Sequence, residues 1–396
     1  MKIITFSTLF PNMQKPGHGI FVETRLRHLV ASGKVASRVV APVPWFPLRH
    51  PRFGAYAAWA RVPLAESRHG IDVLHPRYPV IPKFGMTLAP ALLAASARPV
   101  FARLIDEGFD PDLIDAHYFY PDGVAAALLG RYFNKPVIIT ARGSDLTLFP
   151  SFPLQRAMIR WAAARAAAVI TVCDALREVL VELGTDPAKL RTLRNGVDLE
   201  LFRPIDRRAA RARLNLRRFT LLAAGHLVPV KGHELTIAAL ADLPDVELLV
   251  AGDGPSRRAL GQLAARHGVG QRVRFLGAVP QTELRQYYGA SDALVLPSER
   301  EGWANVLLES MACGTPVVAS AVWGTPEVIA APEAGVLMAV RSANGIIAAV
   351  HALRANYPSR AATRRYAERF SWNDTTAGQL ALFRAVLAHR GATAYV

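Results

Sequence analysis

Residues 293–309 read ALVLPSEREGWANVLLE, and this stretch carries the strongest structural signal in the chain. The apolar run 293–296 predicts a buried strand, and the Pro-Ser pair that follows ends it. A helical pattern of apolar residues begins at Asn305, so Glu301 precedes the helix and Glu309 lies inside it. A strand, a loop and a helix in this order predict a parallel sheet with a site at its strand ends.

Glu301 and Glu309 are separated by roughly 12 Å if each residue rises 1.5 Å along a helix. This distance is too long for a paired-carboxylate site of the glycosidase kind. It fits two contacts on one elongated ligand, and the helix N-terminus between the two glutamates offers unpaired N–H groups to a phosphate. The pattern therefore favours a nucleotide sugar, with ribose at one end, pyrophosphate in the middle and sugar at the other end.

The alternation of short apolar runs and helical patterns extends over the whole chain. Strands are predicted at 2–6, 38–41, 112–116, 137–140, 168–172, 219–224, 247–251, 272–276, 293–296 and 316–319. An Asn-Gly turn signal at 195–196 separates the first five strands from the last five. We therefore predict an α/β protein of two facing Rossmann-like, doubly wound domains, 1–195 and 196–370, with a cleft between them.

Composition limits the function. The 396 residues include 47 Lys and Arg against 31 Asp and Glu, for a net charge of +16, and nearly all the positive charge is arginine. The sequence has no block of five or six like charges, no zinc-finger spacing and no RNA-binding aromatic motif, so we expect no nucleic-acid partner. Arginine and aromatic residues mix between positions 45 and 103, which favours attraction to an anionic membrane surface.

The sequence also indicates a cellular location. Only two cysteines are present, which excludes a disulfide scaffold and fits a reducing compartment. The apolar run 3–10 is short and precedes Pro-Asn instead of a small-residue cleavage site, so we expect a first strand and a cytoplasmic protein at the inner face of the cell membrane. The most apolar stretch, 85–105, contains two prolines and two arginines, which argues against a membrane span.

The segment 301–314 resembles the E-x7-E motif of family 4 glycosyltransferases, which are retaining enzymes of the GT-B fold. Four other segments resemble family motifs in the same order, namely the glycine loop after the first strand, the interdomain turn, the phosphate-binding loop and the turn after the next strand: 17–22, 195–198, 225–232 and 252–255. The resemblance covers nearly the whole chain. It implies a last helix, in 371–396, that crosses back to the first domain.

The resemblance implies a role for each matching residue. Glu309 would bind the ribose hydroxyls, Glu301 would contact the donor sugar, and Lys231 would stabilise the negative charge of the departing diphosphate. Further donor contacts are implied at the phosphate loop, at the amides of the motif and in a base pocket, namely Gly225, His226, Gly302, Trp303, Ala304, Asn305, Val306, Gly277, Ala278 and Val279.

The first domain would bind the acceptor and assist catalysis through Gly17, Gly19, Asp122, His117 and Arg142. Two positions depart from the family pattern. His226 stands where the phosphate loop usually carries an arginine. Arg142 stands where the first-domain motif often has a histidine, and an arginine donates to sugar or phosphate but cannot act as a base.

The predicted function is transfer of a sugar, with retention of configuration, from a nucleotide diphosphate sugar to a glycan or lipid-linked acceptor in cell-surface polysaccharide or glycolipid synthesis. UDP is favoured over GDP as the nucleotide, and the oligomeric state stays open. The resemblance implies no metal ion, and no cofactor is expected. The Asp-x-Asp pattern at 110–112 resembles a metal motif of other glycosyltransferases, but it precedes a strand and is typical of a turn.

Two alternatives stay open. A Rossmann-type oxidoreductase or nucleotide-sugar epimerase would also use this fold, although no Gly-x-Gly-x-x-Gly follows the first strand. A non-catalytic basic adaptor would account for the charge. Such an adaptor would not need Glu301, Glu309 and Lys231 to lie together.

Overall fold

The structure, a computed structural model, describes residues 1–80 and 85–393. It divides into two compact units: unit 1 contains Met1–Arg194 and Asn373–Val396, and unit 2 contains Asn195–Trp372. Each unit is built on one mainly parallel sheet, so the prediction of two Rossmann-like domains is confirmed. The expected boundaries after 195 and after 370 lie next to these divisions.

The sheet of unit 1 has the strand order β10-β9-β8-β7-β1-β2-β5-β4, in which only β4 and β5 pair antiparallel. Its strands are β1 (Lys2–Phe6), β2 (Ala36–Val40), β4 (Ala65–Arg68), β5 (Ile71–Leu74), β7 (Leu113–His117), β8 (Val137–Ala141), β9 (Ala168–Thr171) and β10 (Leu190–Thr192). Strand β1 pairs with β2 on one side and with β7 on the other, so the strand order reverses there. In open α/β sheets, ligands bind outside the carboxyl ends of the strands at such a reversal.

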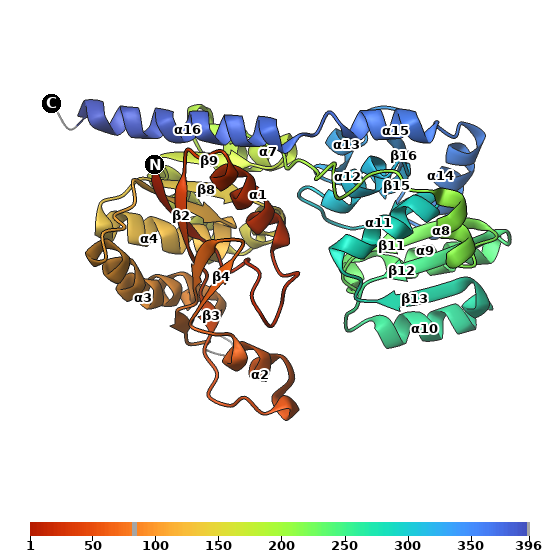
Figure 1. The fold of residues 1–396 in the computed structure, drawn as a ribbon, viewed down its shortest axis with the longest axis horizontal. Helices are drawn as coiled ribbons and strands as arrows, with labels where there is room; N and C mark the ends of the chain where they lie inside the picture. Colours follow the sequence, from red (N-terminus) through yellow and green to blue (C-terminus); the bar gives the residue numbers. More distant parts are fainter. Residues whose placement is uncertain (81–84, 394–396) are drawn as a thin grey trace. The chain divides into compact units, whose positions relative to one another are not determined.

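Helices cover both faces of this sheet, with α3 and α4 on one side and α1 on the other (Figure 1). The helices are α1 (Ile20–Ala31), α2 (Gly54–Arg61), α3 (Gly85–Asp106), α4 (Val124–Phe133), α5 (Ser144–Thr147), α6 (Pro153–Arg165), α7 (Asp174–Glu182) and α16 (Trp372–Thr393). The expected last helix is α16. Its Leu380 and Phe383 are buried in the same apolar core as Val22 and Leu26 of α1, so α16 is part of unit 1.

Helix α3 is continuous over 22 residues although it contains Pro90 and Pro99, two of the residues that argued against a membrane span in this stretch. By length and composition, α3 is the one helix among the described residues that could cross a membrane. Leu93 and Phe101 on one of its faces are fully buried within unit 1.

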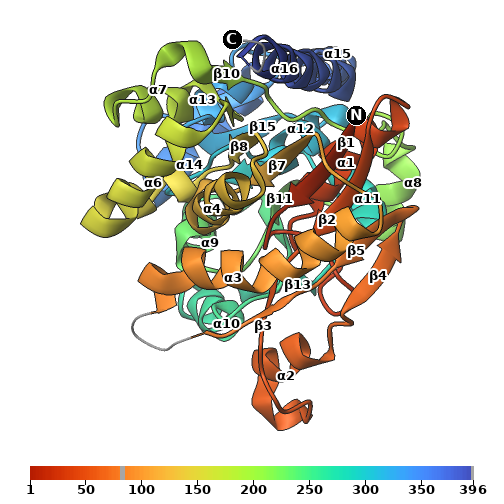
Figure 2. The same cartoon turned by 90° about the vertical axis from the view of Figure 1, so that its left-hand side faces the viewer.

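A small lobe projects from unit 1. Residues 45–64, which we call the α2 lobe, follow the short strand β3 (Val43–Pro44), which pairs with β6 (Arg77–Tyr78). Figure 2 shows helix α2 standing clear of the sheet at the end of this segment, and Figure 1 shows the same from the side. Apolar side chains of the lobe are exposed, with Trp45 at 57% and Leu64 at 70%.

The sheet of unit 2 is entirely parallel, with the order β13-β12-β11-β14-β15-β16. Its strands are β11 (Phe219–Ala224), β12 (Val246–Ala251), β13 (Val273–Gly277), β14 (Ala293–Leu296), β15 (Val317–Ser320) and β16 (Gly335–Met338). Its helices are α8 (Arg207–Arg213), α9 (His233–Ala239), α10 (Arg257–Arg266), α11 (Gln281–Ala290), α12 (Asn305–Ala312), α13 (Thr325–Val328), α14 (Ala343–Ala355) and α15 (Arg360–Ala367). The strand order reverses between β11 and β14.

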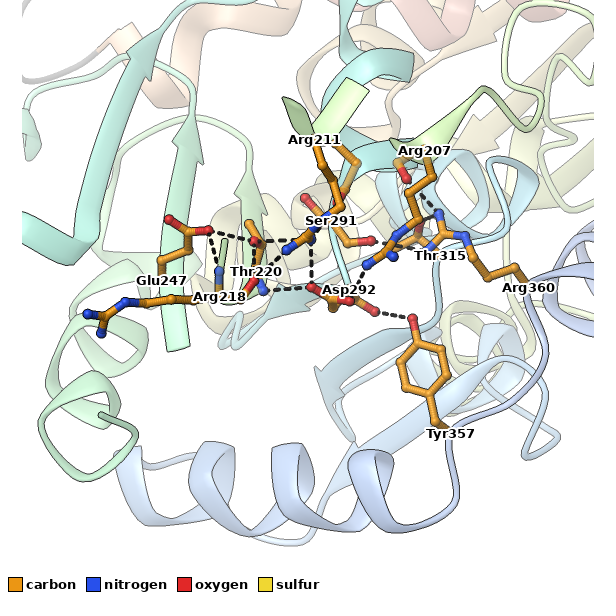
Figure 3. Close-up of polar contacts among 12 residues, drawn as sticks. Arg207, Arg211, Arg218, Thr220, Glu247, Ser291, Asp292, Thr315, Tyr357 and Arg360 are labelled. Carbon is orange, nitrogen blue, oxygen red and sulfur yellow. Dashed lines mark hydrogen bonds and ion pairs between the residues drawn. The ribbon is translucent and has the colours of Figure 1, made fainter. Parts of the chain in front are cut away.

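Side chains at the amino ends of β11 and β14 hold these two strands together (Figure 3). Asp292, directly before β14, accepts hydrogen bonds from the backbone N–H of Thr220 at 2.8 Å and from Arg211 at 2.9 Å, and it also binds Arg207. The Tyr357 hydroxyl donates to the Asp292 carbonyl at 2.7 Å. These contacts fix β11 and β14 relative to each other, and so they also fix the starting points of the loops at the carboxyl ends of the two strands.

Candidate functional site

Two loops meet at the strand reversal of unit 2, one after β11 and one after β14. The backbone N–H of Glu299 donates to the Val230 carbonyl at 2.8 Å, which joins the loops directly. Gly232 has a φ of +68°, and a Cβ there would lie 2.3 Å from the Pro297 carbonyl oxygen. Only glycine allows this approach. The two loops are therefore packed directly against each other, at residues 230–232 of the first loop and 297–299 of the second.

This packing brings Lys231 and Glu301 together, as the motifs predicted. The Lys231 Nζ lies 2.5 Å from Glu301 Oε1, and both side chains are partly buried. Helix α12 begins at Asn305, where the sequence predicted it, and its N-cap residue Ala304 offers no capping side chain. The first N–H groups of α12 therefore have no side-chain cap and can donate to a ligand.

A cavity of about 630 Å³ lies beside this pair, within unit 2. Five residues of the predicted donor set line it, together with six from outside that set: Gly225, His226, Ala278, Val279 and Val306, and then Ala224, Ala251, Gly252, Asp253, Gly254 and Leu284. Gly277 adjoins the cavity, because its carbonyl accepts from the Gly252 N–H at 2.8 Å. A Cβ at Gly252 would lie 1.8 Å from the Gly225 carbonyl oxygen, so crossing backbones form this wall of the cavity.

Glu309 is held by two side chains that sequence reasoning missed. Its Oε2 accepts from the Tyr288 hydroxyl at 2.9 Å, and its Oε1 accepts from Gln281 Nε2 at 3.2 Å. Burial raises the pKa of Glu309, and the hydrogen bonds from Tyr288 and Gln281 act in the opposite direction. Both partners come from α11, and no motif or spacing in the sequence connects that helix to Glu309.

The donor contact expected of Trp303 is through its backbone amide, and its side chain is buried within unit 2. The indole N–H donates to the Asn195 carbonyl at 3.1 Å, and the ring packs against Phe370. The Asn195 side chain also donates to Asn305 Oδ1 at 3.2 Å. Asn195 thus holds the backbone of the motif, whose amides from Gly302 to Val306 are the expected donor contacts.

In unit 1, the glycine loop after β1 closes against its own backbone. Gly19 has a φ of +67° and precedes α1, and a Cβ there would lie 2.3 Å from the Leu9 carbonyl oxygen, whereas Gly17 is open to space. Asp122 is fully buried, and its two oxygens accept from the Thr8 N–H at 3.1 Å and the Thr8 hydroxyl at 2.9 Å. Burial raises the pKa of Asp122 to about 8. These contacts hold the start of the loop after β1 in place.

His117 ends β7, and Arg142 follows β8. Arg142 Nη2 donates to His117 Nδ1 at 2.6 Å, and His117 Nε2 lies 3.2 Å from Asp115 Oδ2. The imidazole is 1% exposed, and burial lowers its pKa to about 4, although the Asp115 carboxylate acts in the opposite direction. His117 is therefore neutral at pH 7 with both nitrogens occupied. Its contacts give it a holding role toward Arg142 rather than the catalytic role that was expected.

The loop of Arg142 is anchored by a buried carboxylate. Asp145 accepts hydrogen bonds from the backbone N–H groups of Arg142 at 3.0 Å, of Gly143 at 2.6 Å and of Phe119 at 2.7 Å. These bonds join the loops after β7 and β8. The structure thus places the predicted donor residues in unit 2 and the predicted acceptor residues in unit 1.

Comparison with known proteins identifies the family. Residues 205–370 match the family model of glycosyl transferases group 1, and residues 76–201 match that of Glycosyltransferase Family 4. The chain belongs to glycosyltransferase family 4. The resemblance of its motifs is therefore confirmed.

Curated relatives of this family 4 protein include D-inositol 3-phosphate glycosyltransferases. Those of Mycobacterium bovis (strain BCG / Pasteur 1173P2) and Mycobacterium tuberculosis (strain ATCC 25618 / H37Rv) are each 36% identical to it over 239 residues. The aligned region is 57% of this chain and 49% of each relative. The chain thus spans about half the length of the curated relatives it matches.

Solved structures show the fold of the family 4 protein. Sucrose-phosphate synthase from Thermosynechococcus elongatus has a TM-score of 0.73 at 21% identity, over 100% of this chain and 98% of that one. HepE from Anabaena in complex with UDP has a TM-score of 0.74 at 21% identity, over 97% of this chain and 100% of that one. These neighbours are glycosyltransferases of the GT-B fold, and the predicted fold class is confirmed.

Proposed function

We propose that this family 4 protein is a retaining, metal-independent glycosyltransferase. It takes a sugar from a nucleotide diphosphate sugar and adds it to a glycan or lipid-linked acceptor in cell-surface polysaccharide or glycolipid synthesis. The Lys231–Glu301 pair beside the glycine-lined cavity carries the proposal. UDP is favoured as the nucleotide, because HepE, a structural neighbour, has been solved with UDP and with UDP-glucose.

The donor would bind along unit 2. The base would fill the cavity beside Gly252, Glu309 would accept from the ribose hydroxyls, and the first N–H groups of α12 would donate to the diphosphate. Lys231 would exchange its contact with Glu301 for the diphosphate, which frees Glu301 for a sugar hydroxyl. Because negative charge on the leaving diphosphate grows along the reaction, Lys231 stabilises the transition state more than the bound donor.

Transfer would occur on one face of the sugar. The bond from the anomeric carbon to the diphosphate oxygen breaks, the bond to the acceptor oxygen forms on the same face, and the acceptor proton passes to the departing phosphate oxygen. This route requires no protein base. It agrees with Arg142, which cannot accept a proton, and with His117, whose two nitrogens are already occupied.

A lipid-linked acceptor would draw the protein to the inner face of the cell membrane. A cavity of about 220 Å³ in unit 1 is lined mainly by apolar and aromatic side chains, among them Met86, Tyr120 and Phe149. It adjoins the turn after β7, which also carries Asp122. An apolar part of the acceptor would fit there, and the exposed aromatic and arginine side chains of the α2 lobe support contact with an anionic surface.

The test is thermal unfolding with UDP, GDP, ADP or NAD, in buffer that contains EDTA. Ligand at a hundredfold excess over Kd stabilises the folded state by about 2.7 kcal/mol. We expect stabilisation by UDP, loss of most of it in Glu309→Ala, and no loss in the control Glu283→Ala, which removes an exposed carboxylate from α11. Stabilisation by NAD alone would contradict the proposal and favour an oxidoreductase.

A further inference from the structure

Five side chains of unit 1 form a buried hydrogen-bonded series, which we call the Asp115 network. Arg25 of α1 donates from Nε to Gln379 Oε1 of α16 at 2.9 Å, and Gln379 Nε2 donates to Asp115 Oδ2 at 3.0 Å. His117 Nε2 lies 3.2 Å from the same Asp115 oxygen. Arg142 Nη2 contacts His117 Nδ1 at 2.6 Å and completes the series.

The direction of every bond in the Asp115 network is fixed by its two ends. Both ends are guanidinium groups, which donate and never accept. Burial lowers the pKa of Arg25 only to about 10, so Arg25 is a cation at pH 7. Because His117 Nδ1 must accept from Arg142, the proton of the neutral ring is on Nε2 and is donated to Asp115. Gln379 therefore donates to Asp115 from one side and His117 from the other, and the Asp115 carboxylate is the one group in the series that only accepts.

The network is retained at an energetic cost. Asp115 Oδ1 and Arg25 Nη2 are buried and have no hydrogen-bond partner among the residues that the structure describes. Apolar side chains of similar volume often stabilise a core as well as buried charges do, or better. Packing alone therefore does not explain why polar and charged side chains occupy these five buried positions.

We infer that Asp115 and Gln379 are positioning residues for Arg142. Asp115 fixes the tautomer of His117, His117 fixes the direction of the Arg142 guanidinium, and Gln379 connects this arrangement to Arg25. The C-terminal helix α16 thereby takes part in the candidate site. The arrangement of the Asp115 network stands without the proposed function. Its effect on turnover rests on the proposed function, in which Arg142 donates to a substrate oxygen.

The bond directions provide a test in which the acceptor at position 115 is either removed or retained. Asp115→Leu removes the oxygen that accepts from both Gln379 and His117. Asp115→Asn keeps one oxygen for both donors, with the amide nitrogen in the place of the unpartnered Oδ1, and removes only the charge. Gln379→Glu places two carboxylates side by side. Asp110→Asn, at an exposed carboxylate paired with Lys135, is the matched control.

We expect Asp115→Leu and Gln379→Glu to lower the midpoint of thermal unfolding by about 5 °C or more, and Asp115→Asn and the control to stay near wild type. Release of UDP from UDP-glucose should fall at least tenfold in Asp115→Leu and Gln379→Glu, with unchanged affinity for UDP, and should be largely kept in Asp115→Asn. Leucine and asparagine are similar in size and both are neutral, so the difference between the two variants at position 115 reports the acceptor oxygen and not packing or charge.

Two results would overturn the inference. One is an Asp115→Asn variant no better than Asp115→Leu in thermal unfolding and in turnover. The other is a wild-type imidazole of His117, assigned in ¹⁵N-histidine spectra with His117→Asn, that is protonated on Nδ1 at pH 7. Neither the unfolding comparison nor the spectrum requires turnover, so failure of the proposed function is recognised separately, by the absence of UDP binding and turnover in wild type.

Discussion

Glu309 is a buried carboxylate, and in the proposed function it would have to stay ionised to accept hydrogen bonds from both hydroxyls of a ribose. Burial raises its pKa, whereas the Tyr288 hydroxyl and the Gln281 amide, which donate to its two oxygens, lower it again. A protonated carboxyl group would turn one acceptor into a donor. The affinity for a nucleotide at this site should therefore depend on the hydrogen bond from Tyr288.

The variant Tyr288→Phe removes that bond and leaves the ring in place. Without the donor, the pKa of Glu309 rises further, so the protonated form persists to higher pH. We expect UDP affinity to fall as pH is lowered, and the pH at which it falls to be higher in the variant than in wild type. The lost bond stabilises only the ionised form, by about 1.5–3 kcal/mol, so we expect at least a tenfold weaker Kd at a pH where Glu309 is ionised in wild type but protonated in the variant. Calorimetric titration with UDP between pH 5 and pH 8 measures both effects.

Tyr287→Phe is the control for this measurement. Tyr287 is the neighbouring residue of α11, and its hydroxyl forms no hydrogen bond within the part of the chain that the structure describes. The control should bind UDP as wild type does at every pH. If Tyr288→Phe keeps the wild-type pH profile, UDP affinity does not depend on the ionisation of Glu309.

At the scale of the elements, Asp292 connects the first turn of α8 with the amino ends of β11 and β14 (Figure 3). Asp292→Ala removes the acceptor for Arg207, Arg211 and the Thr220 N–H at once. Because the guanidinium groups would lose their counter-charge in a partly buried place, we expect unit 2 to lose about 3 kcal/mol of unfolding free energy. Urea denaturation monitored in unit 2 measures this loss.

Asp245→Ala is the matched control in the same unit. Asp245 pairs with Arg354 at 2.6 Å, but this carboxylate is more than half exposed. Exposed ion pairs contribute about 0–1 kcal/mol, so the control should be nearly as stable as wild type. Equal losses in the two variants would show that Asp292 acts only as a surface charge.

The central strands could be predicted from the sequence, but several edge strands could not. Strands such as β1, β8 and β14 are buried on both faces, and their continuous apolar runs are visible in the sequence. The polar strand β4 lies at an edge of its sheet, and β16, also an edge strand, begins with a glycine. Edge strands bury less surface, so their sequences carry a weaker apolar pattern.

In the candidate site too, some contacts could be predicted from the sequence and others could not. Lys231 and Glu301 lie in short motifs, each next to its strand, and their meeting was predicted. Gln379 and Asp115 are 264 residues apart, and Tyr288 reaches Glu309 from another helix. Hydrogen bonds between distant segments leave no periodic pattern in one sequence, so the residues that hold the site could be found only in the structure.

At the scale of the whole molecule, the distribution of charge along the chain indicates which part would contact an anionic surface, whereas the total charge does not. Glu23 is the single carboxylate within residues 1–64, and it is buried in an ion pair with Arg68. The α2 lobe therefore exposes arginine and aromatic side chains with no acidic residue among them. Only 28% of the most apolar part of α3 is buried in the structure. Together these features favour unit 1 as the part that meets an anionic membrane.

The membrane proposal predicts a local effect of charge. Arg49→Ser with Arg52→Ser removes two charges from the α2 lobe, and Arg258→Ser with Arg266→Ser removes two exposed charges from α10 of unit 2 as the control. One arginine near an anionic surface contributes about 1 kcal/mol, so the lobe variant should bind phosphatidylglycerol vesicles roughly thirtyfold more weakly than wild type. Co-sedimentation at low salt measures this partition, and the attraction should disappear at high salt. Equal weakening in both variants would assign the attraction to net charge, and no binding by wild type would remove the membrane from the proposed function.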